Sequence, residues 1–414
     1  MIIVVKRAFE LLRIVLINLL TIVLNLFIWR KESIWLFGSW MGMKFADNSR
    51  YLFQYLNEKK EEYGIKKVIW VTREITVLQE LRSMGYECYM MHSLFSYYYH
   101  IKAGVHVICN MYARSGKYSG DILGVLSTGA KKLQLWHGVG IKACGGLVHK
   151  SLQKSESHNS LLRKLVSSAL FLPGGWKQNA YFLATSEENK RVAIYDHLYS
   201  EKNIIIGIYP RLCETLRFTT AEMEVVEQIK ELKLRQMKII LNLPTFREKD
   251  SYVEPLRIAG FRDFLVKNNI IWIEKKHSAD ANRTDINSDE NIIGLQSWFD
   301  INVLWKYIDL LVSDYSSATS DAIYNNIITL DYCPDYKDYI EHDRGFVAPY
   351  EMYHIVNMPV LNWGCLEAEI LKRLSNSNLY QSENERVRRF LFGDLQPDYD
   401  ILVKTIINKM GILE

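Results

Sequence analysis

Short apolar runs that alternate with amphipathic stretches constrain the fold of this chain more than any other feature. In the first half, four runs have the length and residue types of buried strands, at 66–72, 86–91, 105–110 and 133–136. Stretches with helical periodicity lie at 43–57, 75–84 and 94–103. Strands that alternate with helices form parallel sheets covered on both faces, so we predict an α/β fold.

The pattern resumes in the second half of the chain. Strands are predicted at 203–206, 238–241, 270–273, 309–313 and 328–331, and helices at 221–234, 255–267 and 317–325. A chain of 414 residues is too long for one ordinary core. We therefore predict two Rossmann-like domains, at 32–195 and 196–390, followed by a C-terminal helix at 391–414.

The first 31 residues form a segment that a water-soluble domain would not need. Residues 14–29 carry no charge, and as a helix they span roughly 24 Å, less than the roughly 30 Å of a hydrocarbon core. On a helical wheel the polar side chains fall in an arc of about 140°: Lys6, Arg7, Glu10, Arg13, Asn18, Thr21 and Asn25. This pattern predicts an amphipathic helix lying in the membrane plane, with Arg30 and Lys31 beside it.

Three other interpretations of this segment are a spanning helix, a buried hairpin or oligomer contact, and a secretory signal. A signal requires a small-residue cleavage site after the apolar run. The sequence Ile28-Trp29-Arg30 offers none.

Charge and cysteine content restrict the partners. The net charge is +4, from 51 basic and 47 acidic residues without a long basic tract, which argues against nucleic acid and suits an anionic membrane or substrate. The six cysteines form no C-x-x-C pair and are expected to be buried reduced thiols.

Ligands of open parallel sheets bind beyond the carboxyl ends of the strands, so the residues that follow each strand are informative. His137 comes directly after the run at 133–136, with Gly138 and Gly140 behind it, and suits a general base. Lys142 in the same loop can neutralise a phosphate. The alternative is a histidine that only caps a turn.

In the second half, three strand ends carry groups that bind phosphate. Thr245 and Arg247 follow one strand, and Lys276 and His277 follow the next. After the run at 309–313 a helix begins at once, and its amide groups and hydroxyls suit an anion: Asp314, Ser316, Ser317 and Asp321. A basic surface loop and a plain helix cap are the alternatives. Together these groups predict a cleft for a diphosphate-linked donor.

The order of these motifs resembles a known family. The series is Trp136-His137-Gly138, Tyr209-Pro210-Arg211, Pro244-Thr245-Phe246-Arg247, Lys276-His277 and Asp314-Tyr315-Ser316-Ser317 with Asp321. It is similar to the CDP-glycerol glycerophosphotransferases, which include teichoic-acid primases and polymerases and related capsule polymerases. The segment from Phe37 to Phe53 also looks like the first strand and helix of that family, and the resemblance covers roughly residues 32–345.

The resemblance implies a GT-B-like fold, in which two Rossmann-like domains face a cleft, and a membrane-attached enzyme without a cofactor or a metal site. It implies that His137 and His277 are catalytic. Donor contacts are implied for Arg211, Thr245, Arg247, Lys276, Asp314, Ser316, Ser317 and Asp321, and acceptor contacts for Ser39, Asp47, Asn48 and Lys142. Three places depart from the family: Gly140 and Ser278 replace its usual prolines, and Leu212-Cys213-Glu214 stands where Asn and Asp are expected.

The predicted reaction moves a polyol phosphate, glycerol phosphate in the first instance, from a CDP-polyol to a hydroxyl of a growing teichoic acid or capsule, and releases CMP. The partners are that donor, a lipid-linked or polymer acceptor and the cytoplasmic face of the membrane, with no nucleic acid; oligomerisation is left open. The rivals are a CMP-sialic acid-using polymer synthase and a non-catalytic subunit of a capsule assembly complex. The second rival has no need of both His137 and His277.

Overall fold

A computed structural model of the protein describes residues 2–110, 120–139, 179–195, 199–245, 253–275, 288–342 and 360–412. The chain forms two compact units. The first unit comprises Met1–His137, Ser155–Arg217 and Leu395–Glu414, and the second comprises Gly138–Lys154 and Phe218–Asp394. Four of the predicted site residues lie outside the described residues: Lys142, Arg247, Lys276 and His277.

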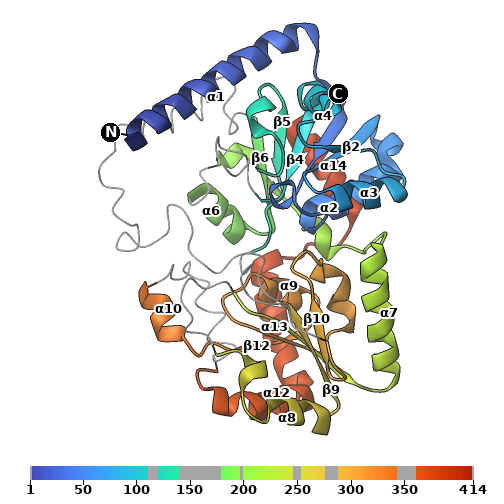
Figure 1. The fold of residues 1–414 in the computed structure, drawn as a ribbon, viewed down its shortest axis with the longest axis vertical. Coiled ribbons are helices and arrows are strands. Elements are labelled where there is room, and N and C mark those ends of the chain that lie inside the picture. The colour runs from blue at the N-terminus through green and yellow to red at the C-terminus, as the bar shows by residue number, and fades with distance from the viewer. Residues whose placement is uncertain are drawn as a thin grey trace. The chain divides into compact units, whose positions relative to one another are not determined.

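The first unit is built on a seven-stranded parallel sheet with the order β3-β2-β1-β4-β5-β6-β7 (Figure 1). Its strands are β1 (Lys31–Phe37), β2 (Lys67–Thr72), β3 (Cys88–Met90), β4 (Ala103–Ile108), β5 (Lys131–Gln134), β6 (Ala180–Ala184) and β7 (Ile204–Ile206). The strand order reverses between β1 and β4, and ligands of doubly wound sheets bind at such a reversal. The α/β fold with parallel sheets is confirmed.

Helices cover this sheet, and its central strands are buried on both faces. All six residues of β4 are buried, as expected for a parallel strand between two helical layers. The helices are α2 (Asp47–Lys59), α3 (Ile75–Ser83), α4 (Leu94–Lys102), α6 (Glu187–Tyr195) and α14 (Tyr399–Met410). Figure 1 shows the red α14 among the blue and cyan elements of this unit, where Tyr399 stacks on Tyr55 at 4.6 Å. The C-terminal helix therefore packs on the first unit.

The N-terminal segment forms a helix, α1 (Ile2–Phe27), whose polar residues Asn18, Thr21 and Asn25 face the first unit. Thr21 is fully buried, Asn25 Nδ2 donates to the Thr128 carbonyl at 3.2 Å, and Thr128 Oγ1 donates to Asn18 Oδ1 at 2.9 Å. The opposite face is apolar and exposed, through Leu12, Leu16, Leu19, Leu20, Val23, Leu26 and Phe27. Among the described residues, no helix is both long and apolar enough to cross a bilayer.

Arg30, which was expected beside this helix together with Lys31, turns its guanidinium into the first unit. Its guanidinium donates to four backbone carbonyls, of Thr128 at 2.9 Å, His100 at 2.9 Å, Ala103 at 2.6 Å and Leu126 at 2.7 Å. A guanidinium has five N–H donors in one plane, so a single arginine can bind carbonyls from several segments. Burial lowers the pKa of Arg30 to about 10, so the group stays charged at neutral pH. Arg30 thereby ties the end of α1 to the first unit.

The second unit holds a five-stranded parallel sheet with the order β10-β9-β8-β11-β12. Its strands are β8 (Lys238–Leu243), β9 (Ile270–Lys275), β10 (Ile292–Leu295), β11 (Leu310–Ser313) and β12 (Ile328–Asp331). Ile239 and Leu241 enter one core while Ile240 enters the other, as the alternation of side chains along a strand requires. The helices are α7 (Thr220–Leu234), α8 (Phe261–Lys267), α9 (Ala318–Tyr324), α10 (Tyr336–His342), α12 (Leu366–Ser375) and α13 (Ser377–Phe392).

The unit boundary differs from the sequence-based one. The strand expected to open the second half is β7, which pairs with β6 at Phe182 and Ile204 and so closes the first sheet. The first unit continues to Arg217, and the predicted boundary at 195 falls inside it. The sequence Ile204-Ile205-Ile206 specifies a strand but carries no information about which sheet receives it.

Candidate active site

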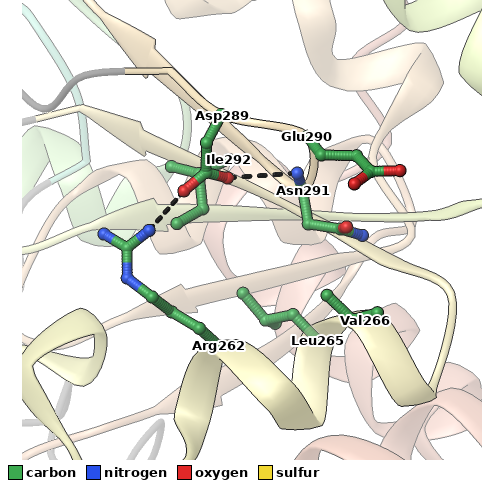
Figure 2. Close-up of a pocket in the computed structure, with 7 residues that line it drawn as sticks. All are labelled: Arg262, Leu265, Val266, Asp289, Glu290, Asn291 and Ile292. Atoms are coloured by element: carbon green, nitrogen blue, oxygen red, sulfur yellow. Dashed lines mark hydrogen bonds and ion pairs between the residues drawn. The ribbon is translucent and has the colours of Figure 1, made fainter.

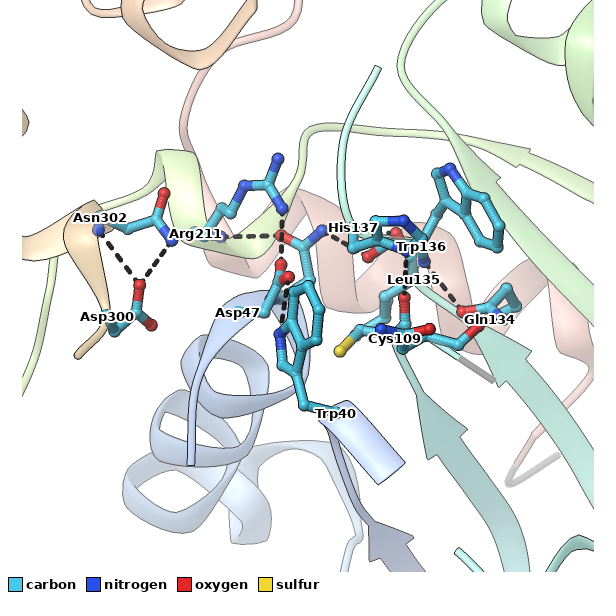
Figure 3. Close-up of polar contacts among 12 residues, drawn as sticks. Trp40, Asp47, Cys109, Gln134, Leu135, Trp136, His137, Arg211, Asp300 and Asn302 are labelled. Carbon is cyan, nitrogen blue, oxygen red and sulfur yellow. Dashed lines mark hydrogen bonds and ion pairs between the residues drawn. The ribbon is translucent and has the colours of Figure 1, made fainter. Parts of the chain in front are cut away.

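Three loops at the carboxyl ends of β1, β4 and β5 surround His137 in the first unit (Figure 3). The imidazole is half-buried, and its Nδ1 lies 3.3 Å from the carbonyl oxygen of Cys109, which follows β4. The rings of Trp136 and Trp40 lie 4.3 Å and 5.9 Å away between centroids. His137 is therefore located near the reversal of strand order, where a ligand is expected.

The backbone around His137 adopts unusual conformations. Nine of the described non-glycine residues have positive φ, and four of them are here: Trp40, Met41, Asp47 and Trp136. Such conformations cost free energy and are typical of functional sites. Trp136 was expected in the strand, but β5 ends at Gln134, whose Oε1 accepts the Trp136 amide at 3.0 Å. This turn aims the following residue, His137, away from the strand.

A buried ion pair supports these loops. Arg211 contacts Asp47 at 2.5 Å, and the two side chains are 3% and 7% exposed. Asp47 Oδ2 also accepts the indole N–H of Trp40 at 3.2 Å. Arg211 thus lies in the first unit with its guanidinium turned to a carboxylate, as Figure 3 shows. The predicted donor contact of Arg211 and acceptor contact of Asp47 stay predictions.

Asn48 and Ser39, the other predicted acceptor contacts described here, are fully buried. Asn48 Nδ2 donates to the Trp136 carbonyl at 2.9 Å, and Asn48 Oδ1 accepts the Arg211 amide at 3.2 Å. Ser39 Oγ donates to the Lys44 carbonyl at 2.7 Å and closes the turn after β1. Both side chains hold the loops beside His137, and their acceptor contacts stay predictions.

Asp121 is a residue that the sequence reasoning missed. It is fully buried, and its carboxylate accepts the amides of Met41 at 2.8 Å, Cys109 at 3.0 Å and Asn110 at 2.7 Å. In the sequence it follows Gly120 without any motif around it, so only the three-dimensional structure reveals it. Burial raises the pKa of the Cys109 thiol, which therefore stays neutral and unsuited to act as a nucleophile.

In the second unit, predicted donor residues meet at the carboxyl ends of β8 and β11. Thr245 donates its amide, at 3.0 Å, and its hydroxyl, at 2.6 Å, to the carboxylate of Asp314, which is 1% exposed. Ser313 Oγ donates to the Leu243 carbonyl at 2.7 Å across the same two strands. The strand order of this sheet reverses between β8 and β11, the position at which such sheets bind ligands.

The serines after β11 lie at the start of α9. Ser316 Oγ accepts the Ala318 amide at 3.3 Å, whereas Ser317 makes no side-chain capping bond; both residues are half-buried. Asp321 is 3% exposed within the helix. On the next turn Ser320 Oγ donates to the Val139 carbonyl at 3.0 Å, within the same unit.

A surface depression in the second unit lies away from these groups (Figure 2). It is lined by α8 and the start of β10, where Arg262 forms an ion pair with Asp289 and Asp289 Oδ1 accepts the Asn291 amide. The start of a parallel strand is the end opposite to the one that binds ligands. Across the described ranges, no cluster of three His, Cys, Asp or Glu side chains could hold a metal ion.

Comparison with known proteins identifies related chains. Residues 19–391 match the family model described as CDP-Glycerol:Poly(glycerophosphate) glycerophosphotransferase. A teichoic acid poly(glycerol phosphate) polymerase of Bacillus spizizenii is 23% identical over 340 residues, which cover 78% of this chain and 79% of the relative. The teichoic acid ribitol-phosphate polymerase TarL of Staphylococcus aureus is 26% identical over 53% of this chain and 38% of its own length.

Solved structures of the wall teichoic acid polymerase TagF share the fold. One covers 98% of this chain and 97% of its own, with a TM-score of 0.67 and 18% identity. Another, of a variant soaked with CDPG, has a TM-score of 0.69 and 18% identity, and covers 98% of both chains. At this level of identity the likeness shows a common fold.

Proposed function

This chain belongs to the CDP-glycerol:poly(glycerophosphate) glycerophosphotransferase family and is a transferase, and we propose that it moves a polyol phosphate from a CDP-polyol to a hydroxyl of a growing cell-surface polymer. Glycerol phosphate is the group that the family description favours. The relatives named as glycerol-phosphate and ribitol-phosphate polymerases support a polyol phosphate and a teichoic acid product. A capsule polymer is the other product class.

The observation that carries the proposal is the placement of His137. Its Nδ1 lies 3.3 Å from the Cys109 carbonyl, which can only accept a hydrogen bond, so we assign the proton of the neutral ring to Nδ1. The basic lone pair then lies on Nε2. A histidine in this state suits the removal of a proton from an acceptor hydroxyl.

In the proposed reaction the acceptor oxygen attacks the β-phosphorus of the donor. A new oxygen–phosphorus bond forms, and the bond between the β-phosphorus and the bridging oxygen breaks. CMP leaves with that oxygen, and the hydroxyl proton passes to His137. Positioning and electrostatic stabilisation carry most of such a transfer.

We assign donor binding mainly to the second unit, with Arg211 as a contact from the first. The cluster of Thr245 and Asp314, with Ser316 and Ser317 after it, lies at the ligand-binding edge of the sheet and supports this role. Arg247, Lys276 and His277 are proposed to stabilise charge on the departing CMP, and Asp321 to orient the serines. Ser39, Asp47, Asn48 and Lys142 are proposed for the acceptor side, and Arg211 for the donor. The two units then act as the acceptor and donor domains of a GT-B-like enzyme.

Helix α1 supports a peripheral location on the cytoplasmic face of the membrane. Asn18 and Asn25 contact the first unit, while exposed leucines and Phe27 cover the other face. A helix with this division lies in the headgroup region of a bilayer. A lipid-linked acceptor would be held at the same surface.

The test uses the full chain with a lipid-extract acceptor and a panel of CDP-glycerol, CDP-ribitol and CMP-sialate. Mass spectrometry of the product is expected to show added glycerol phosphate units, with CMP released only when the acceptor is present. Transfer of sialic acid would support the rival sugar transferase. No transfer from any donor would support a non-catalytic subunit.

A further inference from the structure

We infer that Asp121 is a positioning residue that fixes the orientation and tautomer of His137 through the backbone, without touching the substrate. The inference rests on the proposed role of His137 as the base. It concerns a residue that no sequence motif singles out.

Asp121 holds the backbone on both sides of the imidazole. Both of its carboxylate oxygens are occupied by backbone amides, one by Met41 and the other by Cys109 and Asn110. The amide of Cys109 belongs to the residue whose carbonyl faces His137 Nδ1 at 3.3 Å. Asp121 therefore fixes the acceptor that selects the tautomer of the imidazole.

Asp121 also holds the turn that carries Trp40, the other neighbour of the ring. Met41 directly follows Trp40, whose ring lies 5.9 Å from His137, and both residues have positive φ. A strained turn persists only when its surroundings hold it. The bond from the Met41 amide to Asp121, at 2.8 Å, fastens this turn. One carboxylate thus anchors two of the groups that contact the imidazole.

The packing of Asp121 provides independent support. A side-chain carbon on Gly38 would lie 2.0 Å from the Asp121 carbonyl oxygen, closer than any real contact. Gly38 follows β1 and donates its own amide to the Val107 carbonyl at 3.2 Å. The absence of a side chain at this position lets Asp121 reach between the ends of β1 and β4.

The consequence is a base prepared before the substrate binds. With Nδ1–H directed at the Cys109 carbonyl, Nε2 accepts the proton of the acceptor hydroxyl, and the same carbonyl stabilises the imidazolium that results. Without the anchor, Cys109 and the turn at Trp40 can shift, and the ring can adopt the other tautomer. At metal sites, partners that act on a ligand through a second contact change activity by about 10–100-fold, and we expect an effect of the same order here.

The test is Asp121→Asn in the full chain, measured by nitrogen NMR of the labelled histidine and by kinetics. The amide NH2 of asparagine cannot accept the backbone N–H groups that one carboxylate oxygen now binds. We expect a mixture of His137 tautomers, a fall in kcat of about 10–100-fold, and an unchanged KM for the CDP-polyol. Asp263→Asn, at an exposed position on α8, is the matched control and should change none of these values.

Gly38→Ala reaches the same anchor by another route, and it keeps the inference testable if Asp121→Asn does not fold. It should also shift the tautomer of His137. A folded variant of either kind that keeps the Nδ1–H tautomer and its kcat overturns the inference. If the tautomer shifts but the wild-type chain releases no CMP from any CDP-polyol, the proposed function fails while the positional role of Asp121 stands.

Discussion

Thr245 directs both its backbone amide and its hydroxyl at the carboxylate of Asp314, with the hydroxyl at 2.6 Å. This contact joins the ends of β8 and β11 at the point where the strand order reverses. A buried carboxylate is stable only with such donors around it. The contact also sets where the chain leaves β8, directly before the segment that carries Arg247.

Thr245→Val should destabilise the second unit by about 1–2 kcal/mol, because the carboxylate of Asp314 loses a hydroxyl donor in a buried site. Urea denaturation followed by fluorescence measures the change. The control is Thr405→Val, since the Thr405 hydroxyl donates only to the Ile401 carbonyl at an exposed position. Equal losses in the two variants would refute a special role for this pair.

Ser317→Ala should leave stability within about 0.5 kcal/mol of the wild type, because Ser317 makes no side-chain capping bond to α9. Donor affinity should fall.

The double change Ser316→Ala with Ser317→Ala should weaken CDP-polyol binding by about 1–3 kcal/mol, the scale of hydrogen bonds to a charged group. Calorimetry measures the affinity, and Ser83→Ala at the exposed end of α3 is the control. Unchanged affinity in the folded double variant contradicts a phosphate site at this helix start.

Replacing outward apolar residues of α1 should release the protein from membranes without unfolding it. Leu16, Leu20 and Phe27 are each more than half exposed, so changing all three to Gln should remove lipid contact and preserve the polar contacts to the first unit. Binding to anionic vesicles is measured by sedimentation, with circular dichroism for the fold. The control is Leu234→Gln, at an exposed leucine on α7. Full vesicle binding by the triple variant would disprove α1 as the anchor.

Acidification below about pH 6.5 should destabilise the first unit. His100 and His106 are fully buried, and burial lowers the pKa of His100 to about 4 and that of His106 well below its usual value. The unfolded chain binds these protons below about pH 6.5 and the folded chain does not. The free energy of unfolding should therefore fall by about 1.4 kcal/mol per pH unit for each histidine as the pH decreases.

Urea unfolding between about pH 6.5 and 5.0 tests this dependence. Lys132 does not interfere with this test. Burial lowers its pKa to about 7, so its contribution to the free energy of unfolding changes with pH mainly above that value. His106→Gln should reduce the slope by about half. A slope equal to that of the wild type would show that His106 is not the group that titrates.

The alternation of strands and helices was predictable because parallel strands buried on both faces read as apolar runs. The strand at 328–331 was placed at the bounds of β12, and the helix at 221–234 differs from α7 by one residue. Strands β6 and β10 were missed, and their length is not the reason, because β7 is shorter than either and was predicted. The sheet that receives β7 depends on pairing, which the local sequence does not record.

The candidate site was predictable only in part. The positions of His137, Thr245 and Asp314 at strand ends could be predicted because polar groups directly follow apolar runs. The contacts that hold the loops around His137 could not be predicted from the sequence. Asp121 acts through backbone amides from two distant segments, and Trp136 has a positive φ with its amide bonded to the Gln134 side chain. The four carbonyl contacts of Arg30 were not predictable either, because they come from separate segments of the chain.

The most direct test of His137 as the base compares donor affinity with CMP release in His137→Ala. Because the base acts on the acceptor hydroxyl, calorimetry should show an affinity for CDP-glycerol close to that of the wild type. CMP release at saturating donor and acceptor should fall by about 10²–10⁴-fold, the usual contribution of general acid–base catalysis. A variant that loses donor affinity but keeps its turnover, or one that keeps both, would contradict the account.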